Sequence, residues 1–328
     1  MILDRSTAMR PTMIRSGRKE TRSRQVKPRA LAGSEKRVAG GRLTGVLSLP
    51  ALGAILFWSG VAPFGKYGLA EIPALAFTAL RPAIAAILIF AILVLRRQPL
   101  AIARQDWLRF AIAGTGCIGA SQLLFIGGLS LTSVAHNVIL AATSPLLGAL
   151  IRWGFRRERP DGRTLLGLIV GLCGVVVLVS DAGSTEGTSV AGDLLSLGAA
   201  LTWVGATMLP IPLVVRYGAP RTTAWLLLGS ALLTVPVGAL SMVETVQQGA
   251  SLLAWLALLY SAVGMLGGNA LWQRAVQEIG AQRTLVYLYL EPVCALVLAA
   301  AFLGERVTAT QALGGALALV VVALVRQL

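Results

Sequence analysis

The sequence contains few charged residues for its length. Of its 328 residues, 13% are charged and 56% are hydrophobic, and the mean hydropathy is +0.76, whereas soluble domains carry about 25% charged residues. This composition argues against a water-soluble enzyme and against a chain that is disordered throughout. Apolar runs of about twenty residues, each long enough to cross a hydrocarbon layer, recur along the chain. The sequence therefore predicts a polytopic integral membrane protein.

The sequence also lacks the usual residues of catalytic and metal sites. It has one histidine, His136, and three cysteines, Cys117, Cys173 and Cys294, at unrelated spacings. No CxxC pair, HExxH motif, phosphate-binding loop or GxGxxG after a strand occurs. We therefore expect no enzyme activity, no metal and no cofactor. If the protein moves a solute against its concentration gradient, the energy must then come from the gradient of another substrate or of an ion.

The positive charge is concentrated in residues 1–45, which hold twelve Lys/Arg and three Asp/Glu and so supply +9 of the net charge of +15. This segment has no apolar core, so it is not a secretory signal. No aromatic residue separates the basic ones, which argues against nucleic-acid binding. Three interpretations are open: a disordered cytoplasmic tail held near anionic lipid, an organellar transit peptide, and a start codon assigned too far upstream. We expect the first.

Ten apolar segments predict membrane-spanning helices, because lipid offers backbone N–H and C=O groups no hydrogen-bond partner. The segments are 47–69, 73–95, 107–128, 133–153, 164–181, 192–215, 222–242, 251–272, 284–303 and 308–326. With the N-terminus inside, 26 of the 29 Lys/Arg residues lie on the cytoplasmic side. This asymmetry follows the positive-inside rule and predicts cytoplasmic N- and C-termini. We expect the membrane to be a bacterial inner membrane.

The two halves of the apolar region resemble each other. At an offset of 147 residues, Gln122, Pro145, Glu158-Arg159 and Gly167 recur as Asn269, Pro292, Glu305-Arg306 and Gly314, and at an offset of 145 Gly53 and Trp58 recur as Gly198 and Trp203. Each half has five spans, and duplicating an odd number of spans reverses the orientation of the copy. The sequence therefore predicts an all-α membrane protein of about ten transmembrane helices, in two inverted five-helix repeats at residues 46–182 and 190–327. Inverted repeats are typical of secondary transporters.

Several motifs resemble the EamA-like branch of the drug/metabolite transporter superfamily. The matching stretches are Phe57-Trp58-Ser59-Gly60 with Pro63 and Lys66, Arg81, Thr143-Ser144-Pro145 followed by Glu158-Arg159, and Leu290-Glu291-Pro292 followed by Gly304-Glu305-Arg306. The resemblance covers residues 46–326 and departs from the family pattern at Arg156-Arg157. It implies ten helices and the export or exchange of amino acids, other small metabolites or drugs.

Two ionisable side chains lie inside predicted spans, where a charge costs at least about 2.5–3.5 kcal/mol unless it is paired or hydrated. Glu291 is either a group that contacts a substrate amine or binds a proton, or a structural carboxyl beside the kink at Pro292. Arg81 is either a contact for a substrate carboxylate or phosphate, or a brace between helices. Lys66 is expected to extend its ammonium group to the membrane surface.

Polar and aromatic side chains of several spans are candidates for the walls of a substrate pathway. Gln122 and Asn269 occupy equivalent places in the two repeats, so they either line a cavity from two sides or form interhelical hydrogen bonds. The other candidates are Asn137, Ser144 and Tyr287, with Trp58 and Trp203, for which aromatic packing is the alternative.

These inferences predict a secondary transporter that exports or exchanges small organic solutes, amino acids or related metabolites first, by alternating access. Uniport, exchange and proton coupling are all open, and the sequence does not indicate an oligomeric state. The expected partners are a small-molecule substrate and membrane lipid. The alternative is a membrane-embedded lipid flippase or lipid-linked enzyme, which a lateral opening lined by apolar residues would favour.

Overall fold

The computed structural model describes residues 47–132, 134–157, 159–180, 189–303 and 308–325. The predicted tail, residues 1–45, lies outside the described residues, as do Glu158, Glu305 and Arg306. The position of the Lys66 side chain is also outside the described part.

The described residues form helices and no strand. In chain order the elements are α2 (Leu49–Leu69), α3 (Ala74–Leu95), η1 (Arg104–Asp106), α4 (Trp107–Ala111), η2 (Ile112–Gly119), α5 (Ala120–Leu131), α6 (Val134–Ala141), α7 (Ser144–Arg156), α8 (Gly162–Val179), α9 (Val190–Met208), α10 (Ile211–Tyr217), α11 (Ala219–Gln248), α12 (Leu252–Ile279), α13 (Ala281–Val286), η3 (Tyr287–Tyr289), α14 (Leu290–Leu303) and α15 (Ala309–Val325). Of these, η2 is a π-helix, whereas η1 and η3 are short 3₁₀ turns.

Each predicted span coincides with a helix or with a chain of consecutive helices. Within the described ranges, eight helical stretches are long and apolar enough to cross a membrane, and two shorter apolar stretches lie at Leu49–Gly60 and Ala309–Val321. The all-α membrane architecture is therefore confirmed, while the count of ten spans stays a prediction. The largest difference in length concerns α11, which begins three residues before the predicted span and ends six residues after it.

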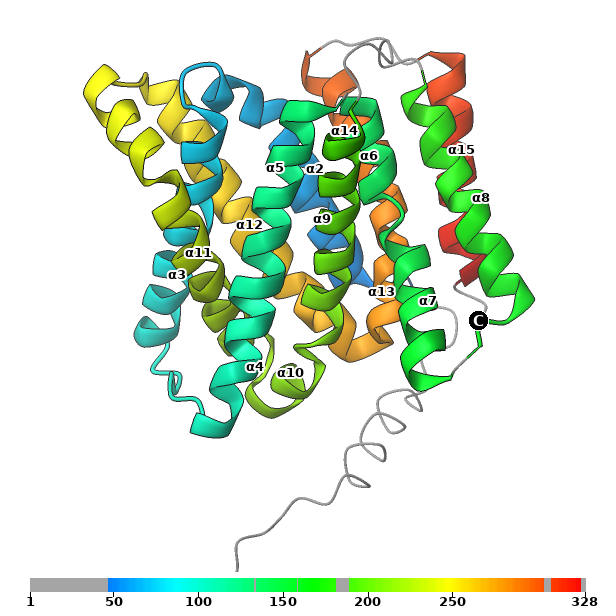
Figure 1. Cartoon of the computed structure of the whole chain (residues 1–328), viewed down its shortest axis with the longest axis horizontal. Helices are drawn as coiled ribbons and strands as arrows, with labels where there is room; N and C mark the ends of the chain where they lie inside the picture. The colour runs from blue at the N-terminus through cyan, green and yellow to red at the C-terminus, as the bar shows by residue number, and fades with distance from the viewer. Residues whose placement is uncertain (1–46, 133, 158, 181–188, 304–307, 326–328) are drawn as a thin grey trace, which may run out of the picture. The chain divides into compact units, whose positions relative to one another are not determined.

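The two halves of the chain run in opposite directions between two ends of the bundle. The loop after α2 and the start of α12 meet at one end, the Glu71 end, where Ser251 hydrogen-bonds Glu71. The loop after α3 and the end of α10 meet at the other, the Asp106 end, where the Tyr217 hydroxyl donates to Asp106. Helix α2 runs toward the Glu71 end, whereas its repeat equivalent, α9 followed by α10, runs toward the Asp106 end, which is the lower end in Figure 1.

Close helix pairs join the two repeats. Helix α2 packs along α12, and α5 packs along α9, which is the equivalent pair; α3 packs along α11 and α8 along α15, each helix with its own equivalent. Exchanging the repeats therefore maps the pair α2–α12 onto the pair α9–α5, and maps each of the other two pairs onto itself. A pseudo-twofold axis between inverted repeats requires this relation. Glycines permit the closest approach: a Cβ atom at Gly174 would lie 2.8 Å from the backbone nitrogen of Ala318.

Candidate functional site

Two equivalent helices of the repeats are broken at the same place. Helices α6 and α7 are separated by a turn at Ala142 and Thr143, and α13 and α14 by the 3₁₀ turn η3. Both breaks lie just before a proline, Pro145 or Pro292, which has no N–H to donate and whose ring clashes with the carbonyl four residues earlier. At the first break, the Ser144 hydroxyl donates to the freed carbonyl of Ala141 (2.7 Å). The proline motifs shared by the repeats thus produce two interrupted helices inside the bundle.

The half-helices nearer the Asp106 end, α7 and α13, are tightly packed. A Cβ atom at Gly148 would lie 2.6 Å from Cδ1 of Leu285, and Leu285 is 0% exposed. The Gln282 amide nitrogen donates to the carbonyl oxygen of Pro145 (2.9 Å). Ser144 is buried as well, although it was a candidate for a pathway wall. The two repeats are therefore tightly packed against each other where α7 meets α13.

The equivalent surfaces nearer the Glu71 end are not closed. At the offset of 147, Leu285 corresponds to Val138, Gly148 to Ala295 and Ser144 to Glu291. The first member of each pair is buried, whereas Val138, Ala295 and Glu291 are all half-exposed. Equivalent positions of the two repeats are thus packed differently: they are buried nearer the Asp106 end and half-exposed nearer the Glu71 end.

Three tryptophans meet near the middle of the bundle. The ring centroid of Trp58 lies 5.3 Å from that of Trp203 and 5.1 Å from that of Trp272. Trp272 is 1% exposed and donates from Nε1 to the hydroxyl of Thr207 (3.1 Å). The Nε1 atom of Trp203 is buried without a hydrogen-bond partner. The predicted residues Trp58 and Trp203 are therefore brought together by a third, Trp272, which the sequence did not single out although it lies only three residues after Asn269.

Glu291 lies in the first turn of α14, beside α2. Its backbone carbonyl accepts a hydrogen bond from the Ser59 hydroxyl (3.0 Å). The residue as a whole is half-buried, and its carboxylate makes no hydrogen bond within the described residues. Within the described residues α2 therefore bonds the backbone of Glu291 and not its carboxylate, and both interpretations of this side chain stay predictions.

Arg81 joins three helices. From α3, its Nη2 donates to Oε1 of Gln122 on α5 (2.5 Å) and its Nη1 to the hydroxyl of Ser261 on α12 (3.5 Å). The guanidinium carbon lies 5.8 Å from the centroid of the Phe77 ring. Two predicted residues, Arg81 and Gln122, are therefore in direct contact although they are 41 residues apart in sequence.

The remaining candidates use part of their hydrogen-bonding capacity inside the fold. Asn269 donates to the Met265 carbonyl (2.8 Å) and Asn137 to the Phe125 carbonyl (3.2 Å), but the side-chain oxygens of both are buried without a partner. Tyr287 accepts a hydrogen bond from the backbone N–H of Ser48 (3.0 Å). Asn137 and Asn269 thus keep a free acceptor each, whereas Tyr287 holds the start of α2.

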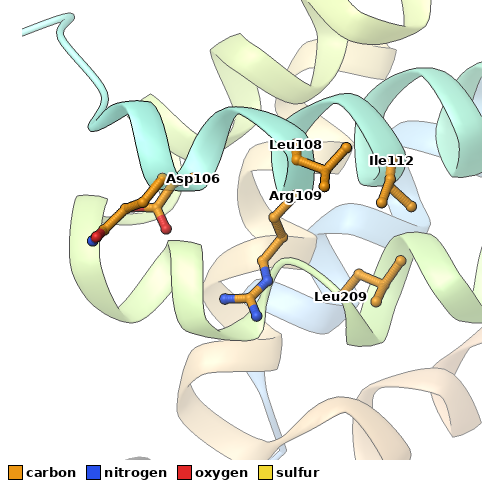
Figure 2. Close-up of a pocket in the computed structure, with 6 residues that line it drawn as sticks. Asp106, Leu108, Arg109, Ile112 and Leu209 are labelled. Atoms are coloured by element: carbon orange, nitrogen blue, oxygen red, sulfur yellow. The ribbon is translucent and has the colours of Figure 1, made fainter. Parts of the chain in front are cut away.

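A pocket of about 380 Å³ lies at the Asp106 end and contains none of the predicted residues. Its lining consists of Gln105, Asp106, Leu108, Arg109, Ile112 and Leu209. Figure 2 shows Leu108 and Ile112, from α4 and η2, facing Leu209, which lies between α9 and α10. Asp106 is already held by Arg216 (2.8 Å) and Tyr217 (2.6 Å). In the described ranges, no group of three His, Cys, Asp or Glu residues could hold a metal ion.

Comparison with known proteins agrees with this architecture. The chain is 24% identical over 264 residues to the uncharacterized transporter YetK of Bacillus subtilis (strain 168), covering 79% of each chain. It is 25% identical over 169 residues to the probable amino-acid metabolite efflux pump of Escherichia coli (strain K12), covering 49% of this chain and 56% of that protein. A crystal structure with 22% sequence identity superposes with a TM-score of 0.70 over 85% of this chain and 96% of the other, which shows a shared fold.

A family model matches the sequence twice, once in each half. The model is that of the EamA-like transporter family, and the matches cover residues 44–180 and 190–327. Together they span more than half of the chain, one match for each half, with residues 181–189 between them. The chain therefore belongs to the EamA-like transporter family.

Proposed function

We propose that this protein is a secondary transporter that moves a small organic solute, an amino acid or a related metabolite, outward across a bacterial inner membrane by alternating access. The observation that carries the proposal is the unequal packing of equivalent surfaces: Gly148 and Leu285 are in contact nearer the Asp106 end, whereas Ala295 and Val138, nearer the Glu71 end, are half-exposed. Because the repeats are inverted, exchanging the two packings closes the Glu71 end and opens the other.

The predicted topology assigns a side to each end. The distribution of Lys/Arg residues in the loops supports a cytoplasmic Asp106 end. With this orientation, the tighter contact between the repeats lies on the cytoplasmic side. The solute would bind between the repeats: the side-chain oxygens of Asn137 and Asn269 are buried without a partner, and the Glu291 carboxylate makes no hydrogen bond in the described residues. An unpaired polar group inside a membrane protein is costly, and a bound solute would satisfy it.

Glu291 is proposed to contact the amine of the solute or to carry a coupling proton. Its equivalent in the first repeat is Ser144, so the carboxylate is unique to the second repeat. The probable efflux pump of E. coli is named for amino-acid metabolites, which supports this substrate class here.

Counterflow in proteoliposomes tests the proposal. Purified protein is reconstituted, and uptake of each labelled amino acid is measured against an excess of the same unlabelled compound inside. We expect exchange of at least one amino acid, with a loss of about tenfold or more in Glu291→Gln. Glu244→Gln, which neutralises an exposed carboxylate at the end of α11, is the matched control and should keep the wild-type rate.

Two results would contradict the proposal. One is the absence of exchange for the whole panel while a labelled phospholipid is moved between leaflets, which would favour a flippase. The other is exchange that Glu291→Gln leaves unchanged in a correctly folded protein, which would remove Glu291 from the pathway.

A further inference from the structure

Arg81 is a charged group inside the bundle that has only neutral partners. Its two hydrogen-bond acceptors are the amide oxygen of Gln122 and the hydroxyl of Ser261. In the part of the chain that the structure describes, no carboxylate forms an ion pair with it. A guanidinium stays protonated and presents five N–H donors in a fixed fork. Two neutral dipoles leave its charge uncompensated, which is costly within a membrane span.

One donor of this guanidinium has no acceptor at all. The Nε atom of Arg81 is buried, with no hydrogen-bond partner, whereas the side chain as a whole is half-buried. The head group is held in place from two sides and by the Phe77 ring 5.8 Å from its carbon. The arrangement therefore fixes the fork and leaves one of its donors unsatisfied.

The partners of Arg81 place it between the two repeats. Gln122 lies on α5, in the third span, and Ser261 lies on α12, in the eighth, and these spans are repeat equivalents of each other. A side chain that bonds to both therefore joins one repeat to the other. In transporters built from inverted repeats, the substrate site lies at the interface of the repeats. The position of the guanidinium is thus that of a substrate contact rather than of a group on the lipid surface.

The symmetry of the repeats is broken at this residue. At the offset that relates Gln122 to Asn269, the equivalent of Arg81 is Leu228. A brace needed by the fold itself would be expected in both repeats, because both contain the same helix pairs. A single positive group in one repeat instead suits a solute that carries its negative charge at one end.

We propose that Arg81 binds the carboxylate of the transported solute, and that this contact restricts the protein to carboxylate-bearing compounds. The carboxylate pairs with the guanidinium, whose Nε–H has no acceptor in the described residues, while Gln122 and Ser261 keep the fork oriented. Charge-assisted, bidentate pairing of this kind is the strongest polar contact that a guanidinium makes. This inference rests on the proposed transport function and adds the substrate class.

The test compares each amino acid with its amide, in which the carboxylate is replaced by a neutral group. Binding is measured by the shift in thermal unfolding of the purified protein in detergent, and exchange is measured by competition in counterflow. For the wild-type protein, we expect the acid to bind about 10- to 100-fold more tightly than the amide. This comparison needs no variant, so it holds even if a change at Arg81 prevents folding.

Variants then show whether Arg81 is the residue that makes the protein prefer the acid over the amide. In Arg81→Gln, the acid and the amide should become equal competitors, and in Arg81→Lys, which keeps the charge but not the fork, the acid should regain only part of its advantage. Arg274→Gln, which removes an exposed arginine at the Asp106 side of α12, is the matched control and should keep the wild-type ratio.

The outcomes separate this inference from the proposed function. Exchange of solutes with equal use of acids and amides, or a preference that survives in Arg81→Gln, overturns the inference and leaves transport standing. Acids that stabilise the protein through Arg81 but are never exchanged support the binding site and contradict the transport function. The inference is also overturned if no carboxylate-bearing compound of the panel shifts the unfolding temperature or competes in counterflow.

Discussion

The carboxylate of Glu71 accepts two hydrogen bonds from Ser251, one from the backbone N–H (2.6 Å) and one from the hydroxyl (2.7 Å). This contact joins the loop between the first two spans to the start of α12. Its counterpart at the other end of the bundle joins the equivalent loops of the opposite repeats, through Asp106 and Tyr217 (2.6 Å). The inverted repeats are thus tied together at both ends, by different chemistry at each.

The Glu71 contact should make stability depend on pH in the acid range. The backbone N–H of Ser251, and then its hydroxyl, hold the pKa of Glu71 below its ordinary value of 4.5. A carboxylate with a lowered pKa stabilises the fold fully above its ordinary value and loses that contribution as the pH falls through the lowered pKa. In thermal unfolding, the advantage of the wild-type protein over Glu71→Gln should therefore be constant from pH 7 down to about 4.5 and shrink below it.

Glu244→Gln is the control for this experiment, because it neutralises another exposed carboxylate that makes no hydrogen bond in the described ranges. The difference between wild type and Glu244→Gln should show no comparable loss. A Glu71→Gln difference that stays constant down to pH 3 would contradict a role for the ionised carboxylate.

The Asp106 contact should couple its partners more strongly than an exposed ion pair does. Asp106 and Arg216 lie 2.8 Å apart, with side-chain exposures of 11% and 47%. Since one partner is largely buried, a double-mutant cycle with Asp106→Asn and Arg216→Gln should give a coupling of about 1 kcal/mol. The pair Arg274–Glu278 on α12, also at 2.8 Å but more exposed, should give about 0.3–0.5 kcal/mol. Equal couplings would show that burial of Asp106 contributes nothing.

The helices and their inversion could be predicted because they depend on local and additive properties. Apolar length determines the spans, and the Lys/Arg distribution is consistent with their number. A kink at Pro292 was expected, whereas the equivalent break before Pro145 was not. The contacts across the bundle could not be predicted in this way. Arg81 meets Gln122 only because α3 lies beside α5, and no property of either residue indicates that neighbour.

The difference in packing between the two ends of the bundle could not be predicted from the sequence either. The repeats contain equivalent residues, so a sequence comparison presents them as two copies of one unit. Which copy of a contact is formed depends on how the halves are tilted against each other. The burial of Leu285 and the exposure of Val138 show this in the structure, although both are apolar residues at equivalent positions.

Replacing Trp272 should destabilise the middle of the bundle. Trp272→Phe removes the hydrogen bond to Thr207 and part of the packing against Trp58. We expect the free energy of unfolding to fall by about 1–3 kcal/mol, measured by denaturation in detergent micelles. Trp153→Phe, on α7 with 46% of the residue exposed, is the matched control and should change stability by less than about 0.5 kcal/mol. Equal effects at the two positions would contradict a packed tryptophan cluster.

A larger side chain at Gly148 should open the Asp106 end. The site has no room, because a Cβ atom there would already lie 2.6 Å from Leu285. Gly148→Leu therefore either costs about 1–3 kcal/mol of overpacking strain or drives α7 and α13 apart, and a transporter with a second conformation has the latter route available. We expect Leu285→Cys, in a background without Cys117, Cys173 and Cys294, to be alkylated from the Asp106 side faster when Gly148→Leu is also present.

The control is Gly154→Leu on the same helix, where an added Cβ atom meets nothing within 4 Å. It should leave the reactivity of Leu285→Cys at the low value expected of a buried residue. If Gly148→Leu lowered the unfolding temperature without raising this reactivity, the contact between α7 and α13 would be a fixed part of the fold. The closed end would then have to open elsewhere, and the exchange of packings between the repeats would lose its support.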